Sequence, residues 1–105
     1  MVTLPDAWKQ YNQTTRGFRE QYALLPIAIQ SATKDACLLF HENRNHTSLR
    51  RHLLQDRRTG SHAPGSFSVA ITMQYRAIYV EDGHTNIWYW IGTHAAYKQF
   101  TGSKR

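Results

Sequence analysis

The sequence predicts an α+β fold in which two N-terminal helices pack on one face of a small, twisted, mostly antiparallel sheet. The first half of the chain carries apolar residues at helical spacing, over residues 16–25 and 27–43. The second half carries three short runs rich in β-branched and aromatic residues, at 67–72, 75–81 and 87–92. Asp82 and Gly83 separate the last two runs, and this dipeptide between apolar runs is a strong signal for a β-hairpin.

The N-terminal residues 1–13 are expected to form an extension before the first of these two helices. Leu4, Trp8 and Tyr11 recur at helical spacing, which allows a short helix, and residues 11–15 can supply a strand. All 105 residues are expected to form a single domain, because domains commonly contain about 100–150 residues.

The two helices are expected to form a hairpin joined at Pro26. Phe18, Tyr22 and Leu25 fall on one face of the first helix, and a second apolar stripe runs from residue 29 to residue 40. Proline fits the first turn of a helix but not its interior, so Pro26 ends one helix or begins the next. The apolar side of this hairpin would cover the sheet.

Residues 49–54 can form a short edge strand, and the polar residues 55–66 are expected to form a mobile loop. The unbroken apolar run at 87–91 is typical of a strand that is buried on both faces. A short final helix is expected over residues 95–100.

The chain is basic, with 13 Lys and Arg against 7 Asp and Glu and a net charge of +6. Residues 41–62 hold five of the nine arginines and four of the six histidines. Such a segment can contact phosphates, since arginine pairs well with them, or can simply be a solvated basic face. The net charge favours nucleic acid or another polyanion as partner, although it also suits a protein with no such partner.

Several classes of protein are disfavoured by what the sequence lacks. Cys37 is the only cysteine, so no disulfide can form within the chain, and the cytoplasm is the expected location. The first residues lack the pattern of a signal peptide, and no stretch is apolar enough for a membrane helix. No HExxH pair, Cys-rich zinc pattern or Gly-rich phosphate loop is present, so neither a metal nor a cofactor is expected.

Four short motifs follow one another in the chain: HTSLR at 46–50, FSVAI at 67–71, YRA at 75–77 and WIGTHAAY at 90–97. In order and spacing they resemble the RelE/ParE superfamily, the toxins of type II toxin–antitoxin systems, one branch of which carries HPSLR, YSVRV, YRA and WIGSHADY. With weaker matches upstream, the resemblance covers roughly residues 14–102. It implies a RelE-like fold, a cognate antitoxin as partner, and a metal-free endoribonuclease that cleaves mRNA, either free or on the ribosome.

The resemblance also implies roles for particular residues. Arg76 matches the strand arginine that contacts the scissile phosphate in RelE-type ribonucleases. His94 matches the position where relatives place a catalytic Arg or His, and Tyr97 or Phe100 lies near the position of their C-terminal tyrosine. RNA supplies its own nucleophile, the 2′-hydroxyl, so such residues need only move protons and stabilise charge. The expected RNA-binding residues are Arg50, Arg51, His52, Arg57 and Arg58.

Two observations leave alternatives open. Ribonuclease relatives often carry two lysines on the strand before the YRA motif, where this chain has Ser68 and Ala70. The alternative function is therefore a non-enzymatic toxin or binding protein of the same fold, such as a gyrase-type inhibitor or an inactive binder of RNA or antitoxin. Likewise, Arg76 can pair with Glu81 or Asp82 instead of a phosphate, and His94 can cap a turn.

The expected hairpin places the two main candidate residues, Arg76 and His94, far apart. If Asp82 and Gly83 form a two-residue loop, Arg76 lies opposite Tyr89. His94 then follows five residues later, about 16 Å farther along an extended strand. In that register the two side chains do not touch, although both can flank one bound nucleotide.

Overall fold

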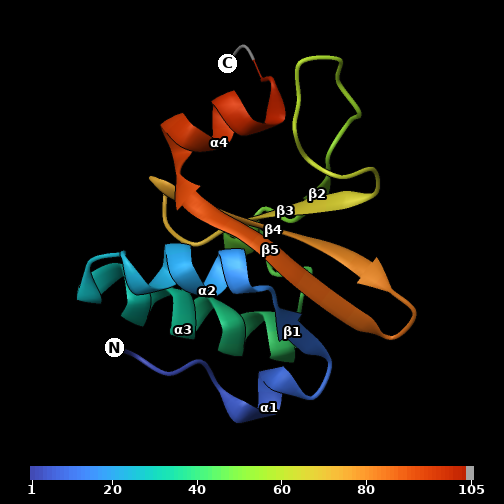
Figure 1. The fold of residues 1–105 in the computed structure, drawn as a ribbon. Helices are drawn as coiled ribbons and strands as arrows, with labels where there is room; N and C mark the ends of the chain where they lie inside the picture. The colour runs from blue at the N-terminus through green and yellow to red at the C-terminus, as the bar shows by residue number, and fades with distance from the viewer. Residues whose placement is uncertain (104–105) are drawn as a thin grey trace.

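A computed structural model of the chain describes residues 1–103 and shows a five-stranded sheet with helices on both faces (Figure 1). The strands lie in the order β1-β5-β4-β3-β2; β1 runs parallel to β5, and the other neighbouring pairs are antiparallel. The predicted α+β fold, with two helices on one face of a mostly antiparallel sheet, is confirmed. The elements are α1 (Asp6–Lys9), β1 (Asn12–Thr14), α2 (Arg16–Ala23), α3 (Ile27–Glu42), a 3-10 turn (Thr47–Leu49), β2 (His52–Leu53), β3 (Ser66–Ala70), β4 (Tyr75–Asp82), β5 (Thr85–Thr93) and α4 (His94–Thr101).

The first 14 residues contribute to the core of the sheet. Trp8 of α1 is buried, and β1 forms an edge of the sheet beside β5. The side chain of Asn12 fixes this strand, because its Nδ2 donates to the carbonyl of Trp8 at 2.7 Å. Its Oδ1 accepts from Asn86 Nδ2 at 3.0 Å and from Trp88 Nε1 at 2.8 Å. The N-terminal extension is thus joined to the central strand by buried hydrogen bonds.

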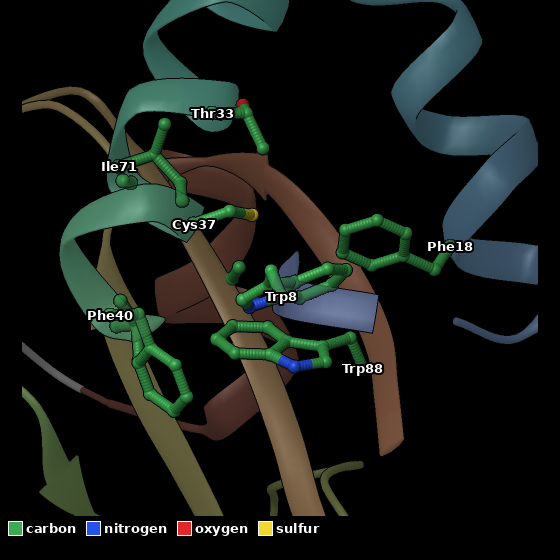
Figure 2. Close-up of a pocket in the computed structure, with 10 residues that line it drawn as sticks. Trp8, Phe18, Thr33, Cys37, Phe40, Ile71 and Trp88 are labelled. Carbon is green, nitrogen blue, oxygen red and sulfur yellow. The ribbon is translucent and has the colours of Figure 1, made fainter. Parts of the chain in front are cut away.

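The helices α2 and α3 cover one face of the sheet and enclose the larger core. Thr15 caps α2 by accepting from the amide of Phe18, and Pro26 stands directly before α3, as its rigid φ favours. Figure 2 shows Phe40 of α3, Phe18 of α2 and Trp88 of β5 around Trp8. The space left between them is only about 10 Å³, so this face is close-packed.

The β4–β5 hairpin differs from the predicted register. Its loop is Gly83 and His84, because Asp82 pairs with Thr85, and a β-bulge interrupts the ladder between Ile78 and Tyr79. The different loop shifts the register by two residues and the bulge in β5 adds a third, so that Arg76 lies opposite Gly92 and not opposite Tyr89. The predicted separation of Arg76 from His94 is therefore wrong: His94 follows only two residues after the partner of Arg76.

The other face of the sheet is covered at one end by α4. The helix begins at His94 because the Thr93 hydroxyl caps it, one residue before the predicted start. Its residues Tyr97 and Phe100 pack with Ile78 and Trp90 in a second, smaller core. Among residues 1–103, no helix is long and apolar enough to cross a membrane.

The edge strand β2 is shorter than the predicted strand over residues 49–54. It contains only His52 and Leu53, because the preceding residues form the 3-10 turn and Arg50 then adopts a left-handed conformation with φ of 46°. This conformation ends the turn and directs the next residues into the sheet. As a result, Arg50 stands at the start of the edge strand on a backbone that L-residues rarely adopt.

Candidate functional site

Arg76 stands on β4, on the face of the sheet that α4 partly covers. Its neighbours across the ladder are Ala70 and Gly92, which are small and leave room above the sheet. Within residues 1–103 no carboxylate forms an ion pair with Arg76, and its buried Nε has no hydrogen-bond partner. Glu81, which the sequence offered as a partner, is 3.4 Å from Arg44 instead. Arg76 is thus a half-buried cation with no anionic partner in the described part of the chain.

His94 lines the same cleft as Arg76. Its backbone N–H donates to the carbonyl of Gln74 at 2.7 Å, which ties the start of α4 to the β3–β4 turn. The ring Nδ1 is buried and has no hydrogen-bond partner among the described residues. Desolvation lowers the pKa of His94, and the nearby charges of Arg76 and Lys98 lower this pKa further. The ring is therefore mainly neutral at pH 7.

Tyr97 lies against both of these side chains. The guanidinium carbon of Arg76 is 5.6 Å from the centre of the Tyr97 ring, a cation–π distance. The His94 ring stacks on Tyr97 with 5.8 Å between ring centres and 18° between planes. His94 and Tyr97 are neighbours because they lie one helical turn apart on α4. The structure thus brings the three candidate catalytic residues into one cluster.

A basic cleft of about 390 Å³ opens beside this cluster. Arg50 and Arg76 both line it, and no acidic residue lines the space. The left-handed backbone of Arg50 costs about 1–3 kcal/mol, a strain that proteins often retain at functional sites. The lining residues are Ser48, Arg50, Ala70, Thr72, Met73, Arg76 and His94.

Two hydroxyl groups in this cleft were not identified from the sequence. Ser48 and Thr72 both line it, and the Ser48 Oγ lies 2.9 Å from His46 Nδ1. The signal was present in the HTSLR motif, where His and Ser are two residues apart. Serine, threonine and histidine are common on surface turns, however, and only the fold shows that this turn borders the cleft.

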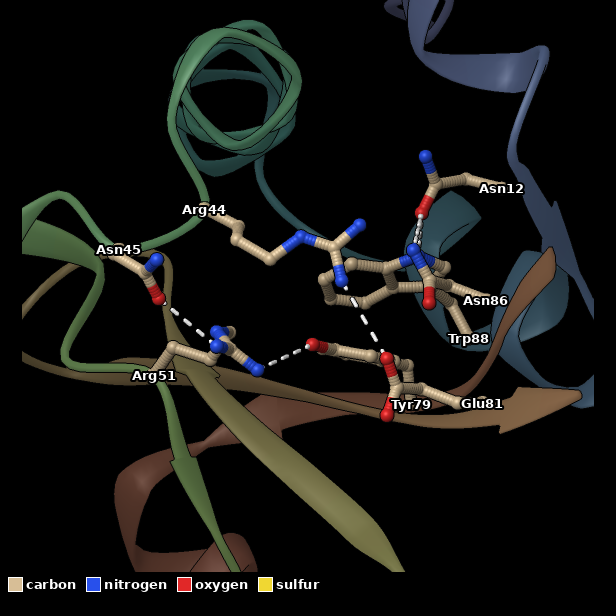
Figure 3. A network of polar contacts seen from close by, with 8 residues as sticks. All are labelled: Asn12, Arg44, Asn45, Arg51, Tyr79, Glu81, Asn86 and Trp88. Carbon is tan, nitrogen blue, oxygen red and sulfur yellow. Dashed lines mark hydrogen bonds and ion pairs between the residues drawn. The ribbon is translucent and has the colours of Figure 1, made fainter. Parts of the chain in front are cut away.

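Arg51 lies on the other side of the sheet from the cleft (Figure 3). Its guanidinium donates to Tyr79 Oη at 3.3 Å and to Asn45 Oδ1 at 2.9 Å. Its guanidinium carbon is also 5.0 Å from the centre of the Phe67 ring. These contacts connect the edge strand to the main core. The structure thus separates Arg51 from Arg50, although the two are neighbours in the predicted RNA-binding group.

His52 and Arg57 line a second cleft, of about 270 Å³, on the far side of Tyr97. His52 Nδ1 lies 3.0 Å from the carbonyl of Arg50, so the edge strand passes from one cleft to the other. Arg58 is exposed and lines neither cleft. The five predicted RNA-binding residues therefore fall into four environments: the first cleft, the second cleft, the core side and open solvent.

The two positions where relatives carry lysines are buried on the same face of the sheet as Arg76. Ser68 pairs with Ile78 and Ala70 pairs with Arg76 across β3 and β4. Ala70 lines the first cleft and carries no charge, and Arg50, at the end of the 3-10 turn, supplies the second cation instead. In the part of the chain that is described, no group of three or more His, Cys, Asp and Glu residues could hold a metal ion.

Comparisons with known proteins agree with this architecture. No protein-family model and no curated protein matches the sequence. YafQ from E. coli strain BL21(DE3) matches in structure with a TM-score of 0.64 at 18% identity, over 82% of this chain and 94% of that chain. The YoeB/ParE toxin from Agrobacterium tumefaciens matches with a TM-score of 0.61 at 16% identity, over 80% of this chain and 98% of that chain.

A chain of the RelB–RelE antitoxin–toxin complex from Methanococcus jannaschii also matches. Its TM-score is 0.57 at 12% identity, over 84% of this chain and 96% of that chain. These identities are low, whereas the coverage of each known chain is nearly complete. The protein therefore has the RelE-like α+β fold of the RelE/ParE-superfamily toxins.

Proposed function

We propose that this protein is the toxin of a type II toxin–antitoxin system and that it is a metal-free endoribonuclease acting on mRNA in the cytoplasm. The observation that carries the proposal is the cluster of Arg76, His94 and Tyr97 beside a basic cleft. Arg76 has no anionic partner in residues 1–103, and a phosphate would supply one. The shared fold supports the same reading, because the matching structures are described as toxins.

The chemistry follows from the protonation state of His94 and from the charge of Arg76. The 2′-hydroxyl of RNA attacks the adjacent phosphorus, the bond to the 5′-oxygen breaks, and that oxygen leaves with a proton taken from water. His94 is neutral at pH 7, so it acts as the base that accepts the 2′-hydroxyl proton. Its Nδ1 is buried, which leaves Nε2 as the nitrogen available to the substrate. Arg76, together with Arg50 of the same cleft, stabilises the charge that develops on the phosphate.

A protein partner completes the proposal. One matching structure is an antitoxin–toxin complex, and we expect this chain to be held inactive by its own antitoxin. The basic net charge of +6 favours an acidic segment in that partner.

A second candidate function is a non-enzymatic toxin or binder of the same fold. The uncharged wall at Ser68 and Ala70 favours it, because two cations that ribonuclease relatives often carry are missing. The first cleft would then bind a phosphate of the RNA without cleaving the RNA chain.

Cleavage of a defined mRNA separates the two functions. The purified protein is incubated with the mRNA, with and without ribosomes, and new 5′ ends are mapped by primer extension. We expect cleavage by the wild type and by Lys34→Ala, which removes an exposed charge from α3, but not by Arg76→Ala. Absence of new ends in both settings, with folded wild-type protein, would leave the binding function as the better account.

A further inference from the structure

We propose that the second cleft holds the nucleotide next to the scissile phosphate of a single-stranded RNA. This inference rests on the proposed function and extends it to a second subsite. The cleft is formed by His52 of β2, by Gln55, Arg57 and His62 of the loop that follows, and by Tyr97 of α4.

The position of the second cleft relative to the first fits a neighbouring nucleotide. Tyr97 stands between them, since its ring contacts Arg76 and His94 while it also lines the second cleft. In the ladder, His52 pairs with Ser68, two residues before Ala70 of the first cleft. Two residues correspond to about 6.6 Å along a strand, which is comparable with the spacing of neighbouring phosphates in an extended single strand.

The chemistry of the second cleft suits a nucleotide. Arg57 brings a full positive charge, His52 and Gln55 bring polar groups, and no carboxylate lines the space. His62 is 8% exposed; its Nε2 lies 2.9 Å from the carbonyl of Gln55, and its buried Nδ1 has no partner in the described residues. A phosphate oxygen would find Arg57 as donor, and a base would find polar groups along its edge.

Two hydrogen bonds join the loop that builds this cleft to α4 and β5. It runs beside α4 (Figure 1), and Ser61 N–H donates to the carbonyl of Phe100 at 2.7 Å. Farther along, Ala63 N–H donates to Tyr89 Oη at 3.0 Å. A subsite that is ordered before binding loses less conformational entropy when the ligand arrives. These hydrogen bonds therefore favour the binding of a nucleotide in the second cleft.

Binding of short oligonucleotides tests the subsite apart from cleavage. The probes are 2′-O-methyl RNAs of two to five nucleotides, which cannot be cleaved because the nucleophilic oxygen is blocked. For the wild type we expect affinity to rise in a step when the oligonucleotide is long enough to reach the second cleft. In Arg57→Ala this step should shrink about tenfold, the value of one charge-assisted hydrogen bond. The slope of log affinity against log salt should also fall by about 0.7 for that oligonucleotide.

Control variants make the result specific. Arg16→Ala removes the same charge from α2, on the opposite face, and should leave the whole length series unchanged. Arg76→Ala should weaken every length, since it removes the first subsite, and Arg57→Lys should recover part of the step. His52→Ala, with melting temperature unchanged, provides a second variant of the same cleft.

The outcomes distinguish this inference from the proposed function. A wild type that cleaves mRNA while Arg57→Ala and His52→Ala keep the full length step would overturn the second subsite alone. Loss of the step in Arg57→Ala, with a wild type that shows the step but never cleaves mRNA, would support the subsite and contradict the ribonuclease. Failure of the folded wild type to bind any oligonucleotide, or displacement of all of them by inorganic phosphate at equal concentration, would overturn the subsite.

Discussion

The two faces of the sheet differ in how completely they are covered. On the face under α2 and α3, Trp8, Phe40, Tyr79 and Trp88 are buried in ring contacts, with Phe40 5.2 Å from Trp88 between ring centres. On the opposite face, α4 covers only one end, and the first cleft lies open beside it. There the buried Nδ1 of His94 and Nε of Arg76 have no partner in residues 1–103.

This difference shows how one pair of strands can serve two purposes. Along β4, Ala77 and Tyr79 point into the helix-covered core, whereas Arg76 and Ile78 belong to the other face. The apolar face supplies stability. The other face can therefore keep polar groups that lack a partner until a ligand binds. Substitutions on the two faces should therefore have separable effects.

The largest expected effect is on catalysis, from His94→Gln. The amide keeps the size of the ring but cannot accept a proton, so we expect about a 10²–10⁴-fold loss of cleavage with RNA binding retained. His84→Gln, in the β4–β5 turn, is the control. An unchanged rate in His94→Gln would show that this histidine takes no part in the reaction. The face with the first cleft would then lose its proposed base.

The dependence of the wild-type cleavage rate on pH also tests whether His94 acts as the base. Because the pKa of His94 is lowered, the ring is neutral near pH 7 and the rate should be level there. As the pH falls through the lowered pKa, the ring becomes protonated, cannot act as a base, and the rate should fall. A rate that instead rises below pH 6.5 would show that the protonated ring is the active form.

The next effect is on stability, from Phe40→Ala in the helix-covered face. Removing this ring from its contacts with Tyr79 and Trp88 should lower the free energy of unfolding by about 3–5 kcal/mol. Leu38→Ala on the same helix, where the side chain is exposed, should change it by less than about 0.5 kcal/mol. Denaturant unfolding gives both values, and an equal loss in the two variants would contradict the assigned core.

Arg76→Lys should reduce cleavage by about 10²–10³-fold and leave the melting temperature nearly unchanged. Lysine keeps the charge but lacks the planar fork that binds two phosphate oxygens and stacks on Tyr97. Arg16→Lys on α2 is the matched control. Full activity in Arg76→Lys would mean that a point charge suffices and that the guanidinium geometry is irrelevant.

The smallest expected effect is the change in stability when Arg50 is replaced, which separates its backbone strain from its role in cleavage. Arg50→Gly removes the strain of the left-handed backbone, so the protein should become more stable by about 1 kcal/mol while cleavage falls. Arg50→Ala should lose the same activity without the gain, because alanine keeps the strained φ. Equal unfolding free energies for the two variants would show that the conformation of Arg50 stores no strain.

Much of the helix-covered face could be predicted from the sequence. The apolar stripes of α2 and α3, the proline between them and the turn signal before β5 each specify local structure by their own chemistry. The motif series also predicted the RelE-like fold, which the comparison with solved structures confirmed. The chemical nature of Arg76, His94 and Tyr97 could be proposed as well, because residue type alone limits what each can do.

The assembly of the site was decided by the tertiary structure. Trp88 and Trp90 are two residues apart, and regular alternation would place both on one face. The bulge at β5 places Trp88 in the main core and Trp90 beside α4, and its one extra residue moves the partner of Arg76 from Ile91 to Gly92, closer to His94. A bulge is favoured when packing on both faces of a sheet improves together, and that balance depends on helices distant in sequence. The sequence by itself determined which residues could do chemistry, and the tertiary packing determined which of them meet.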